Sequence, residues 1–247
     1  MADARKPPTQ RRKRHDLPAS LRLIHAAEAL FAERGIDAVS MREIASAAQC
    51  GDTNAVSYYF GSKPGLLSAI FAHRAEQMDA LRGEMLDRLV GAGRLDDAAA
   101  LLGILFLPQL TLTNDRGRHP YAAFMLHFAT QYWSLTSALF AQTRERAPNL
   151  LRLMQHLTAL AGHVHPDIAR NRILLCNMML QCVLVRWDHG APEDRAVALD
   201  HHVRDVTMTA RANLLAPPGE EQALPASVEE WFAAPISVSP PASPAPR

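Results

Sequence analysis

The segment 53-TNAVSYYFGSK-63 gathers hydrogen-bonding and cationic side chains that suit contact with a nucleic acid. Hydroxyl and amide groups such as those of Thr53, Asn54 and Ser57 can bond to base edges in the major groove, where Asn pairs with adenine. A tyrosine hydroxyl and a lysine ammonium near a helix start, as at Tyr59 and Lys63, can hold a phosphate. These residue types therefore indicate DNA binding.

Three predicted helices would position these side chains. The first begins near Leu21 and ends at Gly35, because glycine suits the left-handed cap that ends many helices. The second begins with a capping box formed by Ser40 and Glu43. A third short helix is expected to be capped by Asp52.

The third helix, expected to end at Tyr59, can enter a major groove only if its outer face is polar and its inner face is small. Ala55 and Val56 would pack it against the first two helices. Two short helices joined by a glycine-containing turn, with such a helix at the end, are typical of a helix-turn-helix. The same pattern fits a packing motif whose polar helix faces water, so the spacing alone leaves both interpretations open.

The remaining sequence predicts an all-α protein. A fourth helix is expected from Ser62 to Val90, and others near 95–107, 120–143, 149–163, 167–188 and 193–214. Prolines separate several of these segments, and no alternating strand pattern occurs. The expected domains are a disordered basic arm (1–17), a helix-turn-helix DNA-binding domain (18–64), a helical effector-binding and dimerisation domain (65–215), and a largely disordered tail rich in Pro, Ala and Ser (216–247).

Two stretches, 26-AAEALFAERGIDAVSMREIASAA-48 and 58-YYFGSKPGLLSAIF-71, resemble the DNA-binding domain of the TetR/AcrR family of bacterial transcriptional repressors. The resemblance extends from Leu23 to Phe71. It implies groove-facing positions at Thr53, Ala55 and Ser57, and phosphate contacts at Ser40, Tyr59 and Lys63. The complete predicted DNA-binding set is Ser40, Arg42, Thr53, Asn54, Ala55, Ser57, Tyr58, Tyr59 and Lys63.

Two features depart from the commonest family pattern. The turn Gln49-Cys50-Gly51 is longer than the usual form, and Ser57 stands where many members have tyrosine. Base preference is therefore not carried over from the resemblance.

The resemblance also implies roles for the other helices. In such proteins they form a ligand-binding and dimerisation domain, and the last two helices pair with their copies in a four-helix bundle. Here the helices near 167–188 and 193–214 would form that seam. A homodimer would place two modules one DNA turn apart on a palindromic operator. The apolar stripes of these helices would equally suit an ordinary buried core.

The segment 121-YAAFMLHFATQYWSLTSALF-140 is dense in aromatic residues and is the candidate ligand site. An aromatic stripe at helical spacing is typical of plain core, but it can also line an apolar cavity with a few polar groups. A ligand held there would be largely apolar. The predicted lining residues are Phe124, Met125, His127, Phe128, Tyr132 and Trp133.

Composition and cysteine usage argue against a membrane-spanning protein and against a disulfide-bonded one. The net charge is only +1, but six basic residues crowd the first fourteen positions, where they would attract an anion or simply form a solvated tail. The apolar run 173–185 is too short to span a bilayer, and Cys50, Cys176 and Cys182 form no disulfide or metal-binding pattern. Cys176 and Cys182 are expected in the core. No metal, cofactor or membrane contact is expected, and a reducing cytoplasm fits best.

The residues of the helix-turn-helix, together with what the resemblance implies, predict a ligand-responsive transcriptional repressor, a homodimer on double-stranded DNA that a small, largely apolar effector releases. The alternative is a transcriptional activator or an effector-independent DNA-binding protein of the same fold. An enzyme is not expected, because the sequence lacks a Gly-rich phosphate loop, a Gly-x-Ser-x-Gly motif and a paired metal-ligand helix motif.

Overall fold

The computed structural model describes residues 17–132, 143–191 and 196–218, and every regular element in these ranges is helical. The all-α prediction is confirmed, with a helix-turn-helix region at the amino-terminal end and a helical region after it. The elements are α2 (Ala19–Arg34), α3 (Met41–Ala47), α4 (Ala55–Phe60), α5 (Lys63–Gly91), α6 (Ala98–Phe106), the 3-10 helix η1 (Leu107–Thr111), α7 (Pro120–Gln131), α9 (Pro148–Leu160), α10 (Pro166–His189) and α11 (Leu199–Leu215).

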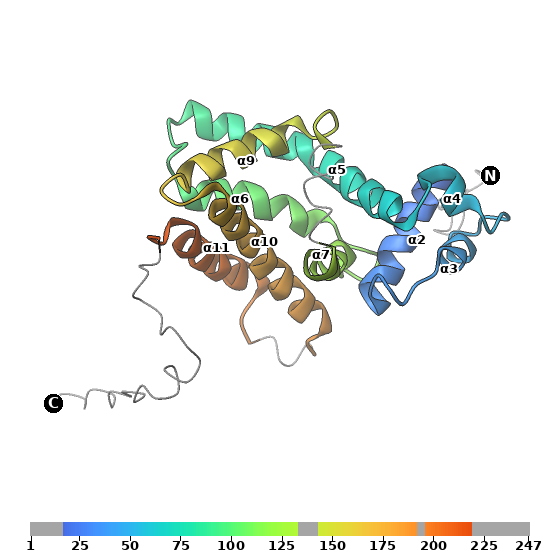
Figure 1. Cartoon of the computed structure of the whole chain (residues 1–247). Helices are drawn as coiled ribbons and strands as arrows, with labels where there is room; N and C mark the ends of the chain where they lie inside the picture. Colours follow the sequence, from blue (N-terminus) through green and yellow to red (C-terminus); the bar gives the residue numbers. More distant parts are fainter. Residues whose placement is uncertain (1–16, 133–142, 192–195, 219–247) are drawn as a thin grey trace, which may run out of the picture. The chain divides into compact units, whose positions relative to one another are not determined.

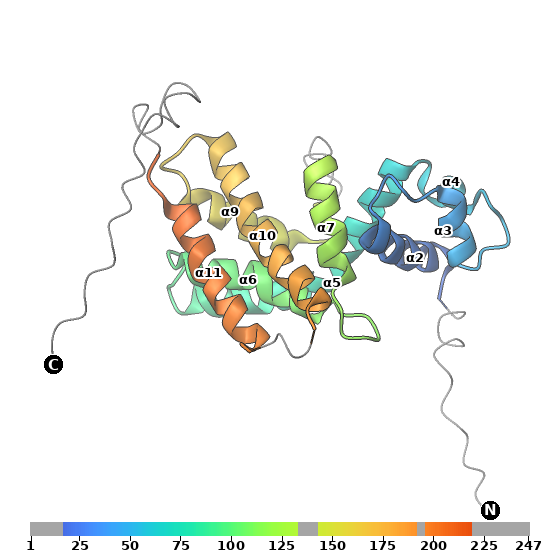
Figure 2. The same cartoon turned by 90° about the horizontal axis from the view of Figure 1, so that it is seen from below.

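The helices form two groups that share the long helix α5. Helices α2, α3 and α4 gather beside the first turns of α5, whereas α6 and α9 pack against α5 further along, and α10 and α11 pack against each other and against α6 (Figure 1). Helix α7 lies between the groups and packs on both α2 and α10 (Figure 2). One cluster of buried apolar side chains runs from α2 to α11. The chain divides at Ala216, and of the second unit, residues 217–247, only Pro217 and Pro218 are described.

The helix-turn-helix begins with the expected capping box. The Ser40 hydroxyl accepts the Glu43 N–H, while the Glu43 carboxylate accepts the Ser40 N–H at 2.8 Å and pairs with Arg34 at 2.9 Å. These contacts, led by the hydrogen bonds from Ser40, lower the pKa of Glu43 to about 2. Gly35, which ends α2, has a φ of 79° and a ψ of 161°, a backbone region that side chains disfavour.

The α4–α5 junction is too close for a side chain at Gly65. A Cβ built there would lie 2.1 Å from the Phe60 carbonyl oxygen, so the end of α4 touches the first turn of α5. Ser62 caps α5 by accepting the Gly65 N–H at 3.2 Å, and Pro64 occupies the first turn as predicted. The start of α5 is therefore held in a fixed position behind α4.

Several predicted boundaries shift. The expected helix 95–107 becomes α6 followed by η1, and the expected helix 120–143 ends at Gln131, with residues 133–142 outside the description. The third helix begins at Ala55 rather than directly after Asp52, because Asp52 closes a turn by accepting the Asn54 N–H at 2.8 Å. Pro120, Pro148 and Pro166 start their helices, because a first turn needs no proline N–H.

Helix α10 has an unusual combination of apolar composition and exposure. Among the described helices it alone is long and apolar enough to cross a membrane by length and composition, a test that core helices of soluble proteins also pass. Only 33% of its most apolar window is buried in the protomer. A large apolar surface of α10 is therefore left facing outward.

A buried carboxylate joins α5 to α9. Asp79 on α5 accepts the backbone N–H groups of Asn149 at 3.2 Å and Leu150 at 2.9 Å, and the Asn149 side-chain amide at 2.9 Å. These backbone groups are unpaired donors in the first turn of α9, so Asp79 caps a helix distant in sequence. Opposite Asn149, a Cβ at Gly83 would lie 2.7 Å from its side chain, which shows how closely the two helices approach.

We predict that Asp79→Ala lowers the free energy of unfolding by about 2–4 kcal/mol, because buried donors at the start of α9 lose their acceptor. Chemical denaturation followed by circular dichroism measures this change. Asp87→Ala is the matched control on the same helix, since Asp87 is exposed and pairs only with exposed Arg152 among the described residues. It should change the free energy by about 0.5 kcal/mol or less. Equal effects of the two substitutions would contradict the capping role.

Candidate nucleic-acid interface and ligand cavity

The outer side of the turn and of α4 carries the polar residues singled out in the sequence. Thr53, Asn54 and Ser57 are exposed, as are Tyr58 at 81% and Tyr59 at 47%. The two tyrosine rings meet edge to face, with their centres 5.0 Å apart. This face presents hydroxyl, amide and aromatic groups to the exterior, as a groove-contacting surface requires.

The inner side of α4 is small and apolar. Val56 is fully buried and Ala55 is 6% exposed, and both belong to the core formed with α2, α3 and α5. The assignment of Ala55 as a groove-facing side chain is therefore wrong, because its methyl group points inward. Its packing role, also expected from the sequence, is the one the structure shows.

The residues assigned to phosphate lie around the start of α3 and the α4–α5 junction. Ser40 and Arg42 are exposed, and Lys63 is half-buried, with its Nζ 5.7 Å from the centre of the Phe31 ring. The Ser40 hydroxyl already donates to Glu43 at 2.7 Å, so a phosphate there would compete with the capping box. Tyr59 and Lys63 are not part of this capping box, so they are better candidates for a phosphate contact than Ser40.

Arg22 fixes the turn between α3 and α4. Its Nε donates to the Ala48 carbonyl at 3.1 Å, its Nη1 to the Leu17 carbonyl at 3.1 Å, and its Nη2 contacts the Cys50 sulfur at 3.8 Å. The carbonyl at Ala48 is one of those left unpaired at the end of a helix. An arginine of α2 thus holds the loop that leads into the outward-facing residues.

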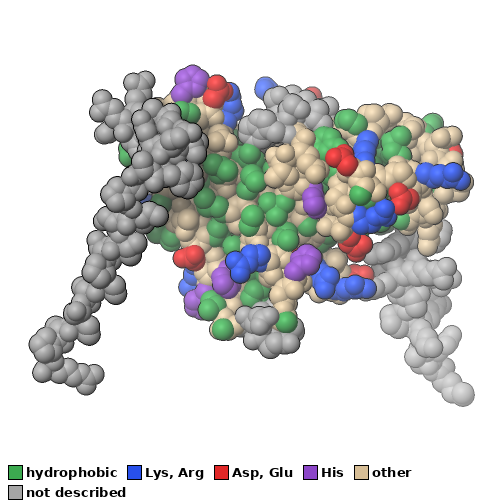
Figure 3. Space-filling view, turned by 60° about the horizontal axis from the view of Figure 1, so that its bottom comes forward, with side chains coloured by type: hydrophobic (Ala, Val, Ile, Leu, Met, Phe, Trp, Pro, Cys, Tyr) green, Lys and Arg blue, Asp and Glu red, His purple; other side chains and the backbone are tan. Residues whose placement is uncertain are grey.

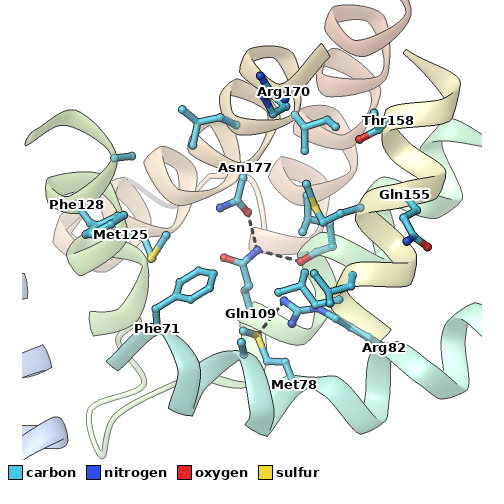
Figure 4. A pocket seen from close by; sticks show the side chains of 18 of the residues that line it. Phe71, Met78, Arg82, Gln109, Met125, Phe128, Gln155, Thr158, Arg170 and Asn177 are labelled. Carbon is cyan, nitrogen blue, oxygen red and sulfur yellow. Dashed lines mark hydrogen bonds between the residues drawn. The ribbon is translucent and has the colours of Figure 1, made fainter. Parts of the chain in front are cut away.

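A second site lies among the later helices. A cavity of about 1250 Å³ is lined by residues of α5, α6, η1, α7, α9 and α10. Most of its lining is apolar, including Phe71, Met78, Leu105, Met125 and Phe128 (Figure 4). Its volume slightly exceeds the usual range for small-molecule pockets, about 300–1,000 Å³.

Only part of the predicted aromatic lining faces this cavity. Met125 and Phe128 do so, together with Tyr121 and Ala129 of the same helix. Phe124, His127 and Tyr132 do not, and Trp133 lies outside the described residues. The aromatic run predicts a single surface, whereas α7 has neighbours on two sides and divides its residues between them.

The other side of α7 packs on the helix-turn-helix region. Phe124 stacks on Phe31 of α2 with ring centres 6.1 Å apart, and a Cβ at Gly35 would lie 3.7 Å from the His127 ring. The Tyr132 hydroxyl donates to Asp37, which raises the pKa of Tyr132 to about 12. The α7 segment therefore contacts both the cavity and the helix-turn-helix region.

Polar contacts reinforce the packing of α2 on α5. Arg74 donates to both oxygens of Glu28, at 2.6 and 2.7 Å, in a largely buried two-pronged pair. The nearby His25 and His73 rings approach to 3.4 Å between their Nε2 atoms. Burial, with the neighbouring cations, lowers the pKa of His73 to about 4, so this ring is neutral at pH 7.

Several polar residues of the cavity are not predicted from the sequence, and three of them lie deep in it. Arg82, Gln109 and Asn177 lie among its apolar side chains, and Gln109 donates to Asn177 at 2.8 Å and to the Leu105 carbonyl at 2.9 Å. A signal for Arg82 existed, because it is one helical turn from Met78 and from Leu86, which are both buried. An arginine within a buried stripe indicates a functional role or a special partner.

The cysteines and acidic or imidazole groups offer no metal site within the described residues, where no three such side chains are grouped. Cys176 is buried as expected, and its sulfur contacts the Ala210 carbonyl at 3.2 Å. Cys182 is exposed instead of belonging to the core, because it lies on the outer side of α10.

Comparison with known proteins bears on the helix-turn-helix region. Residues 23–70 match a family model described as "Bacterial regulatory proteins, tetR family". The matched segment runs from the buried face of α2 to the first turns of α5 and includes α3 and α4. No curated protein matches the chain.

Proposed function

We propose that this chain, a transcriptional regulator of the TetR family by the match over residues 23–70, is a ligand-responsive repressor that binds a palindromic operator as a homodimer. The observation that supports DNA binding most strongly is the division of α4 into a buried inner side and an exposed polar side within the matched segment. The cavity beside α7 supports a response to a ligand.

The exposed residues divide into two kinds of DNA contact. Thr53, Asn54 and Ser57, at the start of α4, would face base edges and set the preferred sequence. Tyr59 and Lys63 would hold a phosphate, because they lie where the positive end of the α5 dipole adds to the lysine charge. Base contacts determine specificity, whereas phosphate contacts add affinity for any sequence.

The outer surface of α10 and α11 supports a homodimer. Hydrophobic side chains gather on the face where these helices lie (Figure 3). Leu175 and Cys182 of α10 and Met208 of α11 are exposed. Exposed apolar surface of this extent is typical of a protein interface. A second copy packed there would form the expected four-helix bundle and set the spacing between the two DNA-binding regions.

The ligand response would run through α7 and α5. A ligand that fills the cavity touches Met125 and Phe128 of α7 and Phe71 of α5, while Phe124 of α7 packs on Phe31. Occupancy changes operator affinity only if the ligand binds more tightly to the arrangement that fits DNA poorly. This large cavity favours an effector-dependent regulator over an effector-independent one.

We predict that Tyr59→Phe and Lys63→Ala weaken binding to all DNA sequences about equally, by roughly three- to tenfold each, because both remove phosphate contacts.

Thr53→Ala should instead change the ranking of operator variants, where a good base contact discriminates by about 1–3 kcal/mol. Gel-shift titrations on the DNA upstream of the chain's own gene, with nonspecific competitor, measure both effects. An unchanged ranking for Thr53→Ala would refute the groove assignment.

We predict that Leu175→Glu combined with Met208→Glu converts the dimer to a folded monomer, because two charges would be buried at the seam. Analytical ultracentrifugation measures the molecular mass in solution, and circular dichroism confirms the fold. Val90→Glu is the control, since Val90 is an exposed apolar residue on α5, outside the α10–α11 face. A wild-type chain that sediments as a monomer, or a double variant that remains a dimer, would contradict this interface.

A further inference from the structure

A buried arginine faces the cavity with nitrogens that no described residue pairs. Arg82 is only 3% exposed, and its Nε and Nη1 have no hydrogen-bond partner among the described residues. Its Nη2 contacts the Met78 sulfur at 3.5 Å, a weak acceptor. Figure 4 shows the Arg82 side chain extending from α5 into the group of cavity residues around Gln109.

The charge of Arg82 lacks a bonded counter-ion in the described part of the chain. A guanidinium remains protonated in proteins, so burial cannot be relieved by loss of the proton, although burial lowers the pKa of Arg82. Asp79 attracts it from one turn away, but the Asp79 oxygens bond to Asn149 and Leu150. Burial raises the pKa of Tyr121, which keeps that nearby phenol neutral.

The other residues of the cavity wall indicate what kind of ligand could pair with the Arg82 guanidinium. Phe71, Met78, Leu105 and Phe128 present apolar surface. The Gln109 Oε1 is buried without a donor among the described residues, so it can accept one hydrogen bond from a ligand. One buried cation in a mostly apolar chamber matches a molecule with one negative charge and a large apolar body.

Among the exposed charged residues that line the cavity, two are cationic and one is anionic. Arg144 and Arg170 line it together with Asp167, and Arg170 pairs with Asp167. Arg144 thus adds a further positive charge at the solvent side. This arrangement would favour approach of an anion rather than of a cation.

We propose that the cavity binds an amphipathic carboxylic acid, with its carboxylate paired to the Arg82 guanidinium and its hydrocarbon body packed on the apolar wall. The cavity volume of about 1250 Å³ accommodates a long chain or several fused rings. This assignment rests on the proposed function in one respect: the acid would be the effector that changes DNA affinity.

The test is direct ligand binding to the full-length protein in the absence of DNA. Isothermal titration calorimetry compares octanoate, dodecanoate, hexadecanoate and cholate with the alcohols or methyl esters that have the same hydrocarbon body. At least one carboxylate should bind roughly tenfold or more tightly than its neutral analogue, equivalent to about 1.4 kcal/mol. Equal affinities, or no binding by any of these acids to the folded protein, would overturn the proposal.

Arg82→Met identifies the residue responsible. It should abolish the preference for the carboxylate and leave the affinity for the neutral analogue nearly unchanged. It should also raise the melting temperature of the free protein by a few degrees, because an unpaired buried charge is removed. Arg88→Met, an exposed arginine on the same helix outside the cavity, should retain the preference. A preference that survives in Arg82→Met would overturn the assignment.

Two further comparisons separate this proposal from its alternatives. Tighter binding of dodecyl phosphate than of dodecanoate would contradict the choice of a carboxylate. Failure of every acid to bind, with sequence-specific DNA binding intact, would overturn the ligand class but leave the regulator function standing. Carboxylate binding that depends on Arg82 but leaves DNA affinity unchanged would support the site and contradict its role as the effector site.

Discussion

Helix α7 must satisfy two sets of neighbours at once, and the proposed coupling between the cavity and the helix-turn-helix depends on that constraint. On one side Met125 and Phe128 line the cavity, and on the other Phe124 stacks on Phe31 of α2 at 6.1 Å. Protein interiors are close-packed, so a shift on one side of a helix is not absorbed by empty space on the other. A ligand that displaces α7 would therefore also push on α2, which packs against the other side of α7.

The long helix α5 provides a second connection between the two regions. It begins at Lys63 beside α4, and its Arg74 pairs with Glu28 of α2. Asp79 and Arg82 lie further along the same helix. Because Asp79 caps α9, the later part of α5 is fixed to the helix that forms one wall of the cavity. The start of α5 is tied to α4 by the close approach at Gly65. These contacts make α5 a stiff element with both functional regions attached.

The sequence predicted the local features of the DNA-binding region well because they depend on near neighbours. Spacing within one or two helical turns is enough to predict the Ser40–Glu43 capping box and the end of α2 at Gly35. It is also enough to predict that the side chains of Ser57 and Tyr58 point outward. The start of α4 was placed too early, since Asp52 serves a turn instead of the helix cap.

The cavity was predicted poorly because it depends on which helices meet. Phe124 and Met125 are adjacent in sequence but face different neighbours, and no local pattern shows that α2 packs against α7. Arg82 is not predicted from the sequence, because an apolar stripe through Leu81 and Met85 fits the pattern of α5 equally well, whereas Arg82 and Leu86 are the buried residues and Leu81 is exposed. An error of one residue in the predicted position of the apolar stripe is therefore enough to hide a buried charge.

The most direct test of the coupling is the DNA affinity of a variant whose cavity is filled by its own side chain. Ala129 of α7 lines the cavity, and Ala129→Phe would occupy part of it in place of a ligand. Thr130→Phe, on the exposed side of the same helix, is the matched control. If cavity and DNA-binding helices are coupled, Ala129→Phe lowers affinity for the upstream DNA by about tenfold or more, near the lower range of typical allosteric coupling, while the fold is retained. Unchanged affinity in a folded Ala129→Phe variant would contradict the coupling.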